Sequence, residues 1–193
     1  FDINDESTET MRLCVFCGSK TGDREEYRSA AVEMGTLMAQ QGHGLVYGGG
    51  QVGLMGVVAD AVLADGGEVI GVIPEQLATR ELLHVGVTTM HRVGSMHERK
   101  AMMEQLADAF IALPGGYGTL EELLEIITWS QLGIHRKNIG ILNTAGFYDG
   151  LLTMIAPLTL VRPLAAGGVT HPIADPPIAA HPEMDPSGGN VTA

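Results

Sequence analysis

A glycine-rich junction between a predicted strand and a predicted helix carries the strongest chemical signal in the sequence. Its nine residues, Pro114 to Glu122, read Pro-Gly-Gly-Tyr-Gly-Thr-Leu-Glu-Glu and follow the apolar run from Asp108 to Leu113. Glycines let the backbone turn tightly and expose its amide hydrogens, and the N-terminus of the next helix adds positive partial charge. The junction therefore predicts a site for an anion, most often a phosphate.

Glu122 has two interpretations from the sequence. A carboxylate one turn into the helix would lie beside the bound phosphate, which suggests chemistry on a phosphorylated sugar. Thr119 and Glu122 also have the spacing of a capping box, in which Glu122 would only accept a hydrogen bond from a free amide at the helix start. Their spacing alone does not separate these two roles.

Arg99, in the segment from Ser95 to Lys100, is the second chemical signal. Ser95 and Glu98 have capping-box spacing, which accounts for both without a function. Arg99 lies in the first turn of the predicted helix, where the macrodipole disfavours a cation, and shares a face with apolar residues three to seven positions further on. Such an arginine usually has an anionic partner, either a substrate or a carboxylate in a buried ion pair. Lys100 points to another side of the helix, as a surface lysine would.

A third junction, Gly48 to Gly53, contains the pattern G-x-G-x-x-G of dinucleotide-binding loops. That function needs an acidic residue at the carboxyl end of the next strand to hold a ribose. Glu68 has about the right spacing, but it begins its strand, so we do not expect a dinucleotide. Gly49 and Gly50 remain candidates for backbone contacts with a substrate.

These junctions belong to a predicted α/β fold, a Rossmann-like doubly wound parallel sheet in a single domain, because short apolar runs alternate with helical stretches. In such a sheet, ligands bind at the carboxyl ends of the strands, so the three junctions should meet at one edge. The expected strands are residues 12–17, 44–47, 68–73, 87–91, 108–113 and 138–143. The expected helices are residues 23–41, 54–64, 96–107, 120–131 and 148–155.

Composition narrows the classes of function. The formal net charge of −12 over 193 residues argues against nucleic acid or an anionic membrane as a partner. No window has the apolar length of a membrane span. Two cysteines do not make a disulfide framework, which favours a cytoplasmic protein. Cys14 and Cys17 form a C-x-x-C pattern, but Cys14 falls inside a strand, where nothing would lower its pKa for redox chemistry.

The expected domain organisation has three parts. Residues 1–10 are an acidic, disordered leader, residues 11–156 form the nucleotide-binding catalytic domain, and residues 157–193 are a proline-rich, largely irregular tail. Seven of the nine prolines lie from Pro157 onward. The helix after Pro114 is apolar on two sides, with Leu124 on one side and Ile126 on the other. A second copy of the chain would cover that other side, so we expect a homodimer.

With these junctions, the chain resembles the LOG (Lonely Guy) family, the cytokinin-activating nucleoside 5′-monophosphate phosphoribohydrolases, many of which carry a lysine decarboxylase label. The resemblance covers residues 11–152, and beyond them the chain departs from the family pattern. It rests on several motifs in order, Cys17–Ser19, Tyr47–Gly50, Gly53–Gly56, Glu81–His84, Ser95–Lys100, Pro114–Glu122, Thr128–His135 and Gly146–Asp149.

The resemblance implies a Rossmann-like homodimer that releases a free base and ribose 5-phosphate from AMP or an N6-isopentenyl-AMP type of nucleotide. It implies catalytic roles for Arg99 and Glu122, and no metal or cofactor. The substrate-binding residues expected from the family pattern and the glycine loops are Glu81, Lys100, Gly115, Gly116, Tyr117, Gly118, Thr119, Leu120, Glu121, Thr128, Gly49 and Gly50.

Two other classes of protein stay open at this point. A non-catalytic carrier of a nucleotide or of molybdenum cofactor could use the same glycine loops, although the pair of Arg99 and Glu122 argues against it. A pyridoxal-phosphate decarboxylase would need a lysine for a Schiff base. Of the three lysines, Lys20, Lys100 and Lys137, none has a convincing setting.

Overall fold

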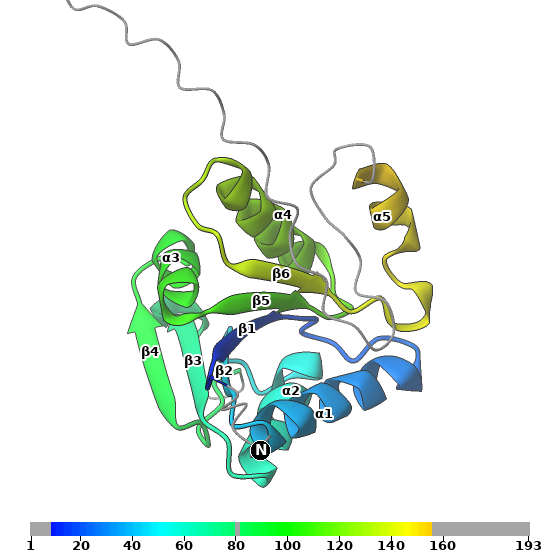
Figure 1. The fold of residues 1–193 in the computed structure, drawn as a ribbon. Coiled ribbons are helices and arrows are strands. Elements are labelled where there is room, and N and C mark those ends of the chain that lie inside the picture. The colour runs from blue at the N-terminus through cyan, green and yellow to red at the C-terminus, as the bar shows by residue number, and fades with distance from the viewer. Residues whose placement is uncertain (1–8, 80–81, 156–193) are drawn as a thin grey trace, which may run out of the picture.

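The structure is a computed structural model and describes residues 9–79 and 82–155. Within them, six parallel strands form one sheet in the order β4-β3-β2-β1-β5-β6 (Figure 1). The strands are β1 (Arg12–Phe16), β2 (Gly44–Tyr47), β3 (Val69–Pro74), β4 (Thr89–Val93), β5 (Ala109–Ala112) and β6 (Asn138–Ile141). The helices are α1 (Glu25–Gln40), α2 (Gly53–Ala64), α3 (Met96–Leu106), α4 (Tyr117–Gln131) and α5 (Asp149–Ile155), with short 3-10 turns η1 (Glu75–Leu77) and η2 (Thr144–Gly146).

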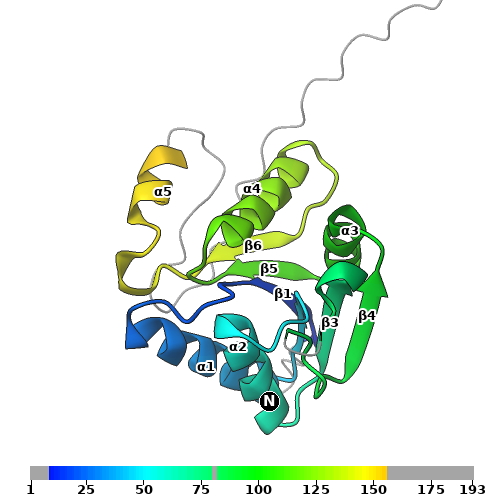
Figure 2. The same cartoon turned by 180° about the vertical axis from the view of Figure 1, so that it is seen from behind.

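The sheet is covered on both faces, which is why its central strands are apolar at successive positions. Every residue of β2 and β3 is buried. Helices α1 and α2 lie on one face, and α3 and α4 on the other (Figures 1 and 2). Along β1, Leu13 and Val15 join the core cluster that contains α1 and α2 residues, whereas Cys14 and Phe16 join the cluster that contains Met103 of α3 and Ile126 of α4.

The predicted α/β class is confirmed, and most expected elements lie within two residues of the observed ones. Strand β4 begins at Thr89 rather than 87, and helix α4 begins at Tyr117, earlier than the predicted 120. Of the residues on the two predicted apolar sides of α4, Ile126 is 3% exposed and lies in the core, whereas Leu124 is 40% exposed. Helix α4 packs through Leu123 and Ile126, which are three positions apart on one helical face.

Parts of the predicted organisation fall on residues that the structure does not describe. The tail, residues 157–193, most of the leader, residues 1–10, and Glu81 lie outside the described residues. The described strands and helices run from Arg12 to Ile155. Across the described ranges, every helix is too short or too polar to cross a membrane.

The chain reverses its direction across the sheet between β1 and β5. Strands β1 to β4 are added outward on one side, and β5 then pairs with the other side of β1. Loops at such a switch point diverge and leave room for a ligand at the carboxyl ends of the strands. Here the β1 and β5 loops are held together, because the Gly18 amide donates to the Pro114 carbonyl at 3.0 Å. The strongest sequence motif therefore lies at the switch point.

Candidate active site

The loop between β5 and α4 has the form of an anion site. Gly116 is the N-cap of α4, so the amides of the next residues begin the helix without partners from a preceding turn. Gly116, Tyr117 and Gly118 are exposed, and Tyr117 is 93% exposed. Gly115 packs directly against the Thr119 hydroxyl, where any Cβ would overlap that oxygen. Exposed amides at the positive end of a helix bind phosphate or carboxylate groups.

Glu122 does not cap helix α4, which overturns the capping-box interpretation. The helix begins two residues before Thr119, and its N-cap, Gly116, has no side chain to accept a bond. The Glu122 carboxylate instead pairs with Arg99, with Oε1 3.0 Å from Nη2. Both side chains are largely withdrawn from water, at 9% exposure for Glu122 and 12% for Arg99. The predicted catalytic pair is thus brought together across helices α3 and α4.

Arg99 is held at a second point by the sheet. Its Nε donates to the main-chain carbonyl of Val72 in β3 at 3.2 Å. Helix α3 begins as its sequence predicts, since the Ser95 hydroxyl accepts from the Glu98 amide at 3.1 Å. The Glu98 carboxylate accepts from the Gly94 amide at 2.7 Å, one residue before its expected partner in a capping box. These contacts fix the first turn of α3 and with it the base of the Arg99 side chain.

Burial and charge act in opposite directions on Glu122. Burial raises the pKa of its carboxyl above the ordinary value, the Arg99 guanidinium lowers it in part, and Glu121 raises it again. The pKa is raised overall. A carboxyl with a raised pKa, next to one cation and an anion-binding loop, is suited to accept a proton or to stabilise a developing positive charge.

Lys100 is not the surface lysine that its helix position indicated. Its side chain is 9% exposed, and Nζ lies 2.5 Å from Glu121 Oε1 and 2.9 Å from Glu125 Oε2. Burial lowers the pKa of Lys100, but hydrogen bonds to the two carboxylates outweigh burial and raise it overall. Two of the predicted binding residues, Lys100 and Glu121, therefore bind each other. Sequence reasoning missed Glu125, although its position one turn after Glu121 was a usable signal.

The glycines after β2 contact Leu83 and His84. Gly49 has a φ of +75°, which favours glycine, and its carbonyl accepts from the His84 amide at 3.0 Å. Gly50 forms an isolated bridge with Leu83. Thr128 lies apart from these contacts, because it is exposed and its hydroxyl donates to the Leu124 carbonyl within α4.

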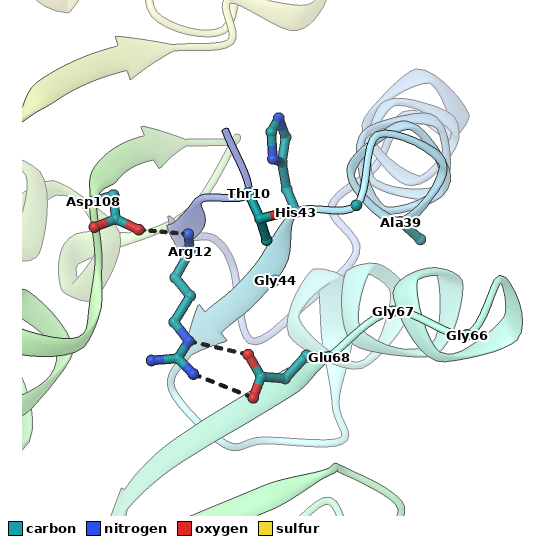
Figure 3. Close-up of a pocket in the computed structure, with 10 residues that line it drawn as sticks. Thr10, Arg12, Ala39, His43, Gly44, Gly66, Gly67, Glu68 and Asp108 are labelled. Carbon is teal, nitrogen blue, oxygen red and sulfur yellow. Dashed lines mark hydrogen bonds and ion pairs between the residues drawn. The ribbon is translucent and has the colours of Figure 1, made fainter. Parts of the chain in front are cut away.

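Two cavities differ in the residues that line them. One, of about 330 Å³, lies beside the anion loop, between the β1–α1 loop and Pro114 to Gly116, with Tyr27 and Phe147 as aromatic walls. The other, of about 420 Å³, lies at the amino ends of the strands (Figure 3). Arg12 in that cavity already pairs with Glu68 at 3.0 Å, so its charge is satisfied. Arg99 and Glu122 line neither of these two cavities.

The structure also bears on the functions that the sequence disfavoured. Glu68 lies at the amino edge of the sheet and pairs with Arg12, far from the position of a ribose-binding acid. Cys14 and Cys17 are free and buried. Burial, followed by the charge of Glu122, raises the pKa of both thiols, opposite to the change that activates a redox cysteine. Among residues 9–79 and 82–155, no three His, Cys, Asp or Glu side chains form a potential metal site.

Comparisons of sequence found relatives over most of the chain. A general family model described as "Possible lysine decarboxylase" matches residues 55–165. The Cytokinin riboside 5'-monophosphate phosphoribohydrolase LOG of Oryza sativa subsp. japonica is 58% identical over 144 residues, which are 75% of this chain and 60% of that protein. The Cytokinin riboside 5'-monophosphate phosphoribohydrolase LOG7 of Arabidopsis thaliana is 56% identical over 153 residues, which are 79% of this chain and 70% of that protein. This chain thus spans less than two thirds of the length of the rice protein.

Solved structures share the fold at lower identity. The molybdenum cofactor binding protein from the phototrophic bacterium Rippkaea orientalis aligns with a TM-score of 0.65 at 21% identity, over 83% of this chain and 92% of that one. The Moco carrier protein from Chlamydomonas reinhardtii aligns with a TM-score of 0.62 at 21% identity, over 81% and 90%. At this identity the likeness is one of fold alone.

Proposed function

This chain belongs to the LOG family, and we propose that it hydrolyses the N-glycosidic bond of adenosine 5′-monophosphate, with or without an N6 substituent. The products are the free base, which is a cytokinin when N6 is suitably substituted, and ribose 5-phosphate. The observation that carries the proposal is the buried Arg99–Glu122 pair, whose carboxylate belongs to the helix α4 that begins at the exposed amides of the anion loop.

The geometry supports a hydrolysis through a transition state with oxocarbenium character. The 5′-phosphate binds the amides around Gly116 to Thr119, and the sugar then lies toward Glu122. As the bond from C1′ to the base breaks, its electron pair leaves with the base, and the Glu122 carboxylate stabilises the positive charge on the sugar. Water adds to C1′ and gives a proton to Glu122, the departing base takes a proton from solvent at its nitrogen, and Glu122 then releases its own proton to solvent.

Arg99 orients the carboxylate in this mechanism. Because the guanidinium binds Oε1 of Glu122, we assign Oε2 to the attacking water. The positive charge of Arg99 also lowers the pKa of Glu122 against the effect of burial, which favours the ionised form that can act as a base.

The residues that we propose to bind the nucleotide come from three strand exits and from helix α4. The anion loop supplies amides and the Thr119 hydroxyl. Lys100 acts in the observed geometry through its ion pairs with Glu121 and Glu125, which hold the outer side of α4 against α3. The full proposed set is Glu81, Lys100, Gly115, Gly116, Tyr117, Gly118, Thr119, Leu120, Glu121, Thr128, Gly49 and Gly50.

Incubation with AMP, adenosine and N6-isopentenyl-AMP, followed by chromatography of the free base, tests the proposed reaction. Binding energy from the phosphate can speed the chemical step only when the phosphate is present. We therefore expect base release from the two monophosphates and little from adenosine. Equal turnover of adenosine and AMP would contradict the proposed role of the loop, and AMP binding without base release would favour the carrier function instead.

A decarboxylase that uses pyridoxal phosphate does not fit the lysines of this chain. Lys100 is bound by two carboxylates, and Lys137 Nζ contacts both the main-chain carbonyl and the carboxylate of Glu104, at 2.5 and 2.6 Å. Lys20 is exposed on the β1–α1 loop. A Schiff base needs a neutral amine free to attack, and neighbouring carboxylates favour the charged form of Lys100. The absorbance spectrum of the purified protein checks this exclusion.

We also propose that the enzyme is a cytoplasmic homodimer. Its free thiols are compatible with a reducing compartment. Large apolar side chains are exposed on and just after helix α4, with Leu124 at 40%, Leu132 at 66% and Ile134 at 60%. A two-fold contact would remove them from water. Light scattering should give twice the chain mass for the wild type and a lower mass for Leu132→Glu, and a monomeric wild type would contradict the dimer.

A further inference from the structure

Gly48 lies directly beneath the Arg99 guanidinium, at the exit of strand β2. A Cβ on Gly48 would overlap Arg99 Nη2 and would lie only 3.2 Å from Cζ, at the centre of the guanidinium. The overlapped Nη2 is the atom that pairs with Glu122 Oε1. The β2 loop therefore approaches the candidate catalytic pair closely at a residue without a side chain.

The backbone at Gly48 does not itself require glycine. Of the three consecutive glycines after β2, only Gly49 has a positive φ. A Cβ on Gly50 would meet the end of the flexible Met55 side chain, which can move. At Gly48, apart from Arg99, the nearest atom would be Met55 Sδ at 3.4 Å, an ordinary contact. The space taken by the guanidinium is thus the feature that excludes a side chain at Gly48.

Arg99 has little freedom to move away from a side chain at Gly48. Its Nε is bound to the Val72 carbonyl in β3, and its backbone belongs to the capped first turn of α3. A planar group held at Nε can only swing its far end, and that end carries Nη2. A new Cβ would therefore displace Nη2 and disrupt its contact with Glu122.

We propose that Gly48 is a positioning residue, whose missing side chain leaves space for the Arg99 guanidinium at the exit of β2 and so lets it pair with Glu122. The expected effect of Gly48 on turnover rests on the proposed function, whereas its expected effect on the Arg99–Glu122 ion pair does not. Gly48 touches the guanidinium and acts on the reaction through Arg99.

The first test compares Gly48→Ala with Gly44→Ala in the hydrolysis of AMP. A displacement of about 1 Å in catalytic groups can lower the rate by about a hundredfold, so kcat of Gly48→Ala should fall by about that factor with KM nearly unchanged. Gly44 lies at the other end of β2, beside the Arg12–Glu68 pair, where a Cβ would be 3.1 Å from the Glu68 carboxylate (Figure 3). Gly44→Ala disturbs an ion pair of the same kind far from the site and should keep kcat. Wild-type kcat in Gly48→Ala would overturn the proposal.

A second measurement does not depend on catalysis. With 13C-labelled glutamate, NMR follows the titration of the Glu122 carboxyl in wild type and in Gly48→Ala. Separating Arg99 from Glu122 should raise the pKa of that carboxyl further, because the remaining charged neighbours, Lys100, Glu121 and Glu125, are the same in both proteins. An unchanged titration would overturn the role of Gly48 even if the wild type releases no base. If instead the wild type releases no base but the titration shifts, the proposed function fails and the role of Gly48 in the ion pair stands.

A double-mutant cycle covers the case in which Gly48→Ala folds poorly. In an Arg99→Ala background the new methyl group meets only ordinary contacts, so Gly48→Ala should leave the unfolding midpoint unchanged or raise it. In the wild-type background it should lower the midpoint. The cycle subtracts the separate cost of losing Arg99. Equal shifts in both backgrounds would show that Gly48 and Arg99 are independent, and would overturn the proposal.

Discussion

Replacing Glu122 by glutamine removes one charge and keeps the size of the side chain and an oxygen that can face Arg99. If the carboxylate stabilises the oxocarbenium ion and activates water, turnover of AMP should fall by about a hundredfold or more. Exposure of 9% places this charge where little water can screen it, so the lost stabilisation is not replaced by solvent. The assay is chromatography of the base released from AMP under saturating substrate.

The same substitution should not weaken the fold at neutral pH. Burial raises the pKa of Glu122 even with Arg99 beside it, which means that the folded protein favours the neutral carboxyl more than the unfolded chain does. Glutamine resembles that neutral form. The unfolding midpoint of Glu122→Gln should therefore equal or exceed that of the wild type, as for other groups kept for activity at a cost in stability.

Glu125→Gln is the matched control for Glu122→Gln. It removes the same charge from the next turn of α4, and Lys100 keeps its contact with Glu121. Turnover of Glu125→Gln should stay close to that of the wild type. Glu122→Gln with turnover within a few-fold of the wild type would refute the catalytic role, and a clear fall in its unfolding midpoint would refute the reasoning from burial.

Three further predictions follow from contacts of the same site. Arg99→Ala should cripple base release and, unlike Glu122→Gln, lower the unfolding midpoint, because it leaves Glu122 buried without its cation; kinetics and thermal unfolding check both. Because the pKa of Glu122 is raised in the folded protein, Glu122 binds its proton more tightly there than in the unfolded chain. The unfolding free energy of the wild type relative to Glu122→Gln should therefore fall as the pH rises from about 4.5, the ordinary pKa, through the raised value. Urea titrations at each pH measure this difference. Tyr148→Phe should lower the unfolding free energy by about 1–2 kcal/mol, because the Tyr148 hydroxyl donates to the buried Leu113 carbonyl at 2.6 Å. Tyr47→Phe should lower it little, because no described residue bonds the buried Tyr47 hydroxyl. Chemical denaturation compares the two variants.

The sequence predicted the fold well because its signals are local and repeated. The apolar runs place all six described strands within two residues at their starts and ends, and a glycine follows α1 and α2 closely. The three loops meet at one edge because parallel strands all end on the same side of a sheet. None of these inferences depends on the position of an individual side chain.

Individual side-chain contacts were harder to predict, and the two capping boxes show why. The Ser95 hydroxyl accepts from the Glu98 amide as their spacing indicates, although the Glu98 carboxylate bonds the Gly94 amide instead of that of Ser95. Thr119 and Glu122, with the same spacing, form no cap. The difference is where the helix begins, because Gly116 already serves as the N-cap of α4. Spacing alone does not reveal the start of a helix that follows several glycines, since glycine favours both loops and N-caps.

Contacts between helices were also not predictable from the sequence. The burial of Lys100 depends on α3 and α4 lying side by side, which brings Glu121 and Glu125, more than twenty residues away, to one amine. The exposed position of Leu124 has the same origin, because the packing angle of α4 decides which of its two apolar sides meets the sheet. These are properties of tertiary packing, and no pattern within a single helix encodes them.

The pairing of β1 with β5 sets the order in which the site can assemble as the chain folds. The Arg12 amide bonds the Asp108 carboxylate across a separation of 96 residues, so the two strands must close a long loop before they pair. Contacts this distant in sequence form slowly. A chain emerging from the ribosome exposes the glycine loop after β2 and then Arg99 before Glu122 has been made. The carboxylate therefore reaches its arginine only after β5 has docked, so a nucleotide that needs both side chains would bind only once β5 has joined the sheet.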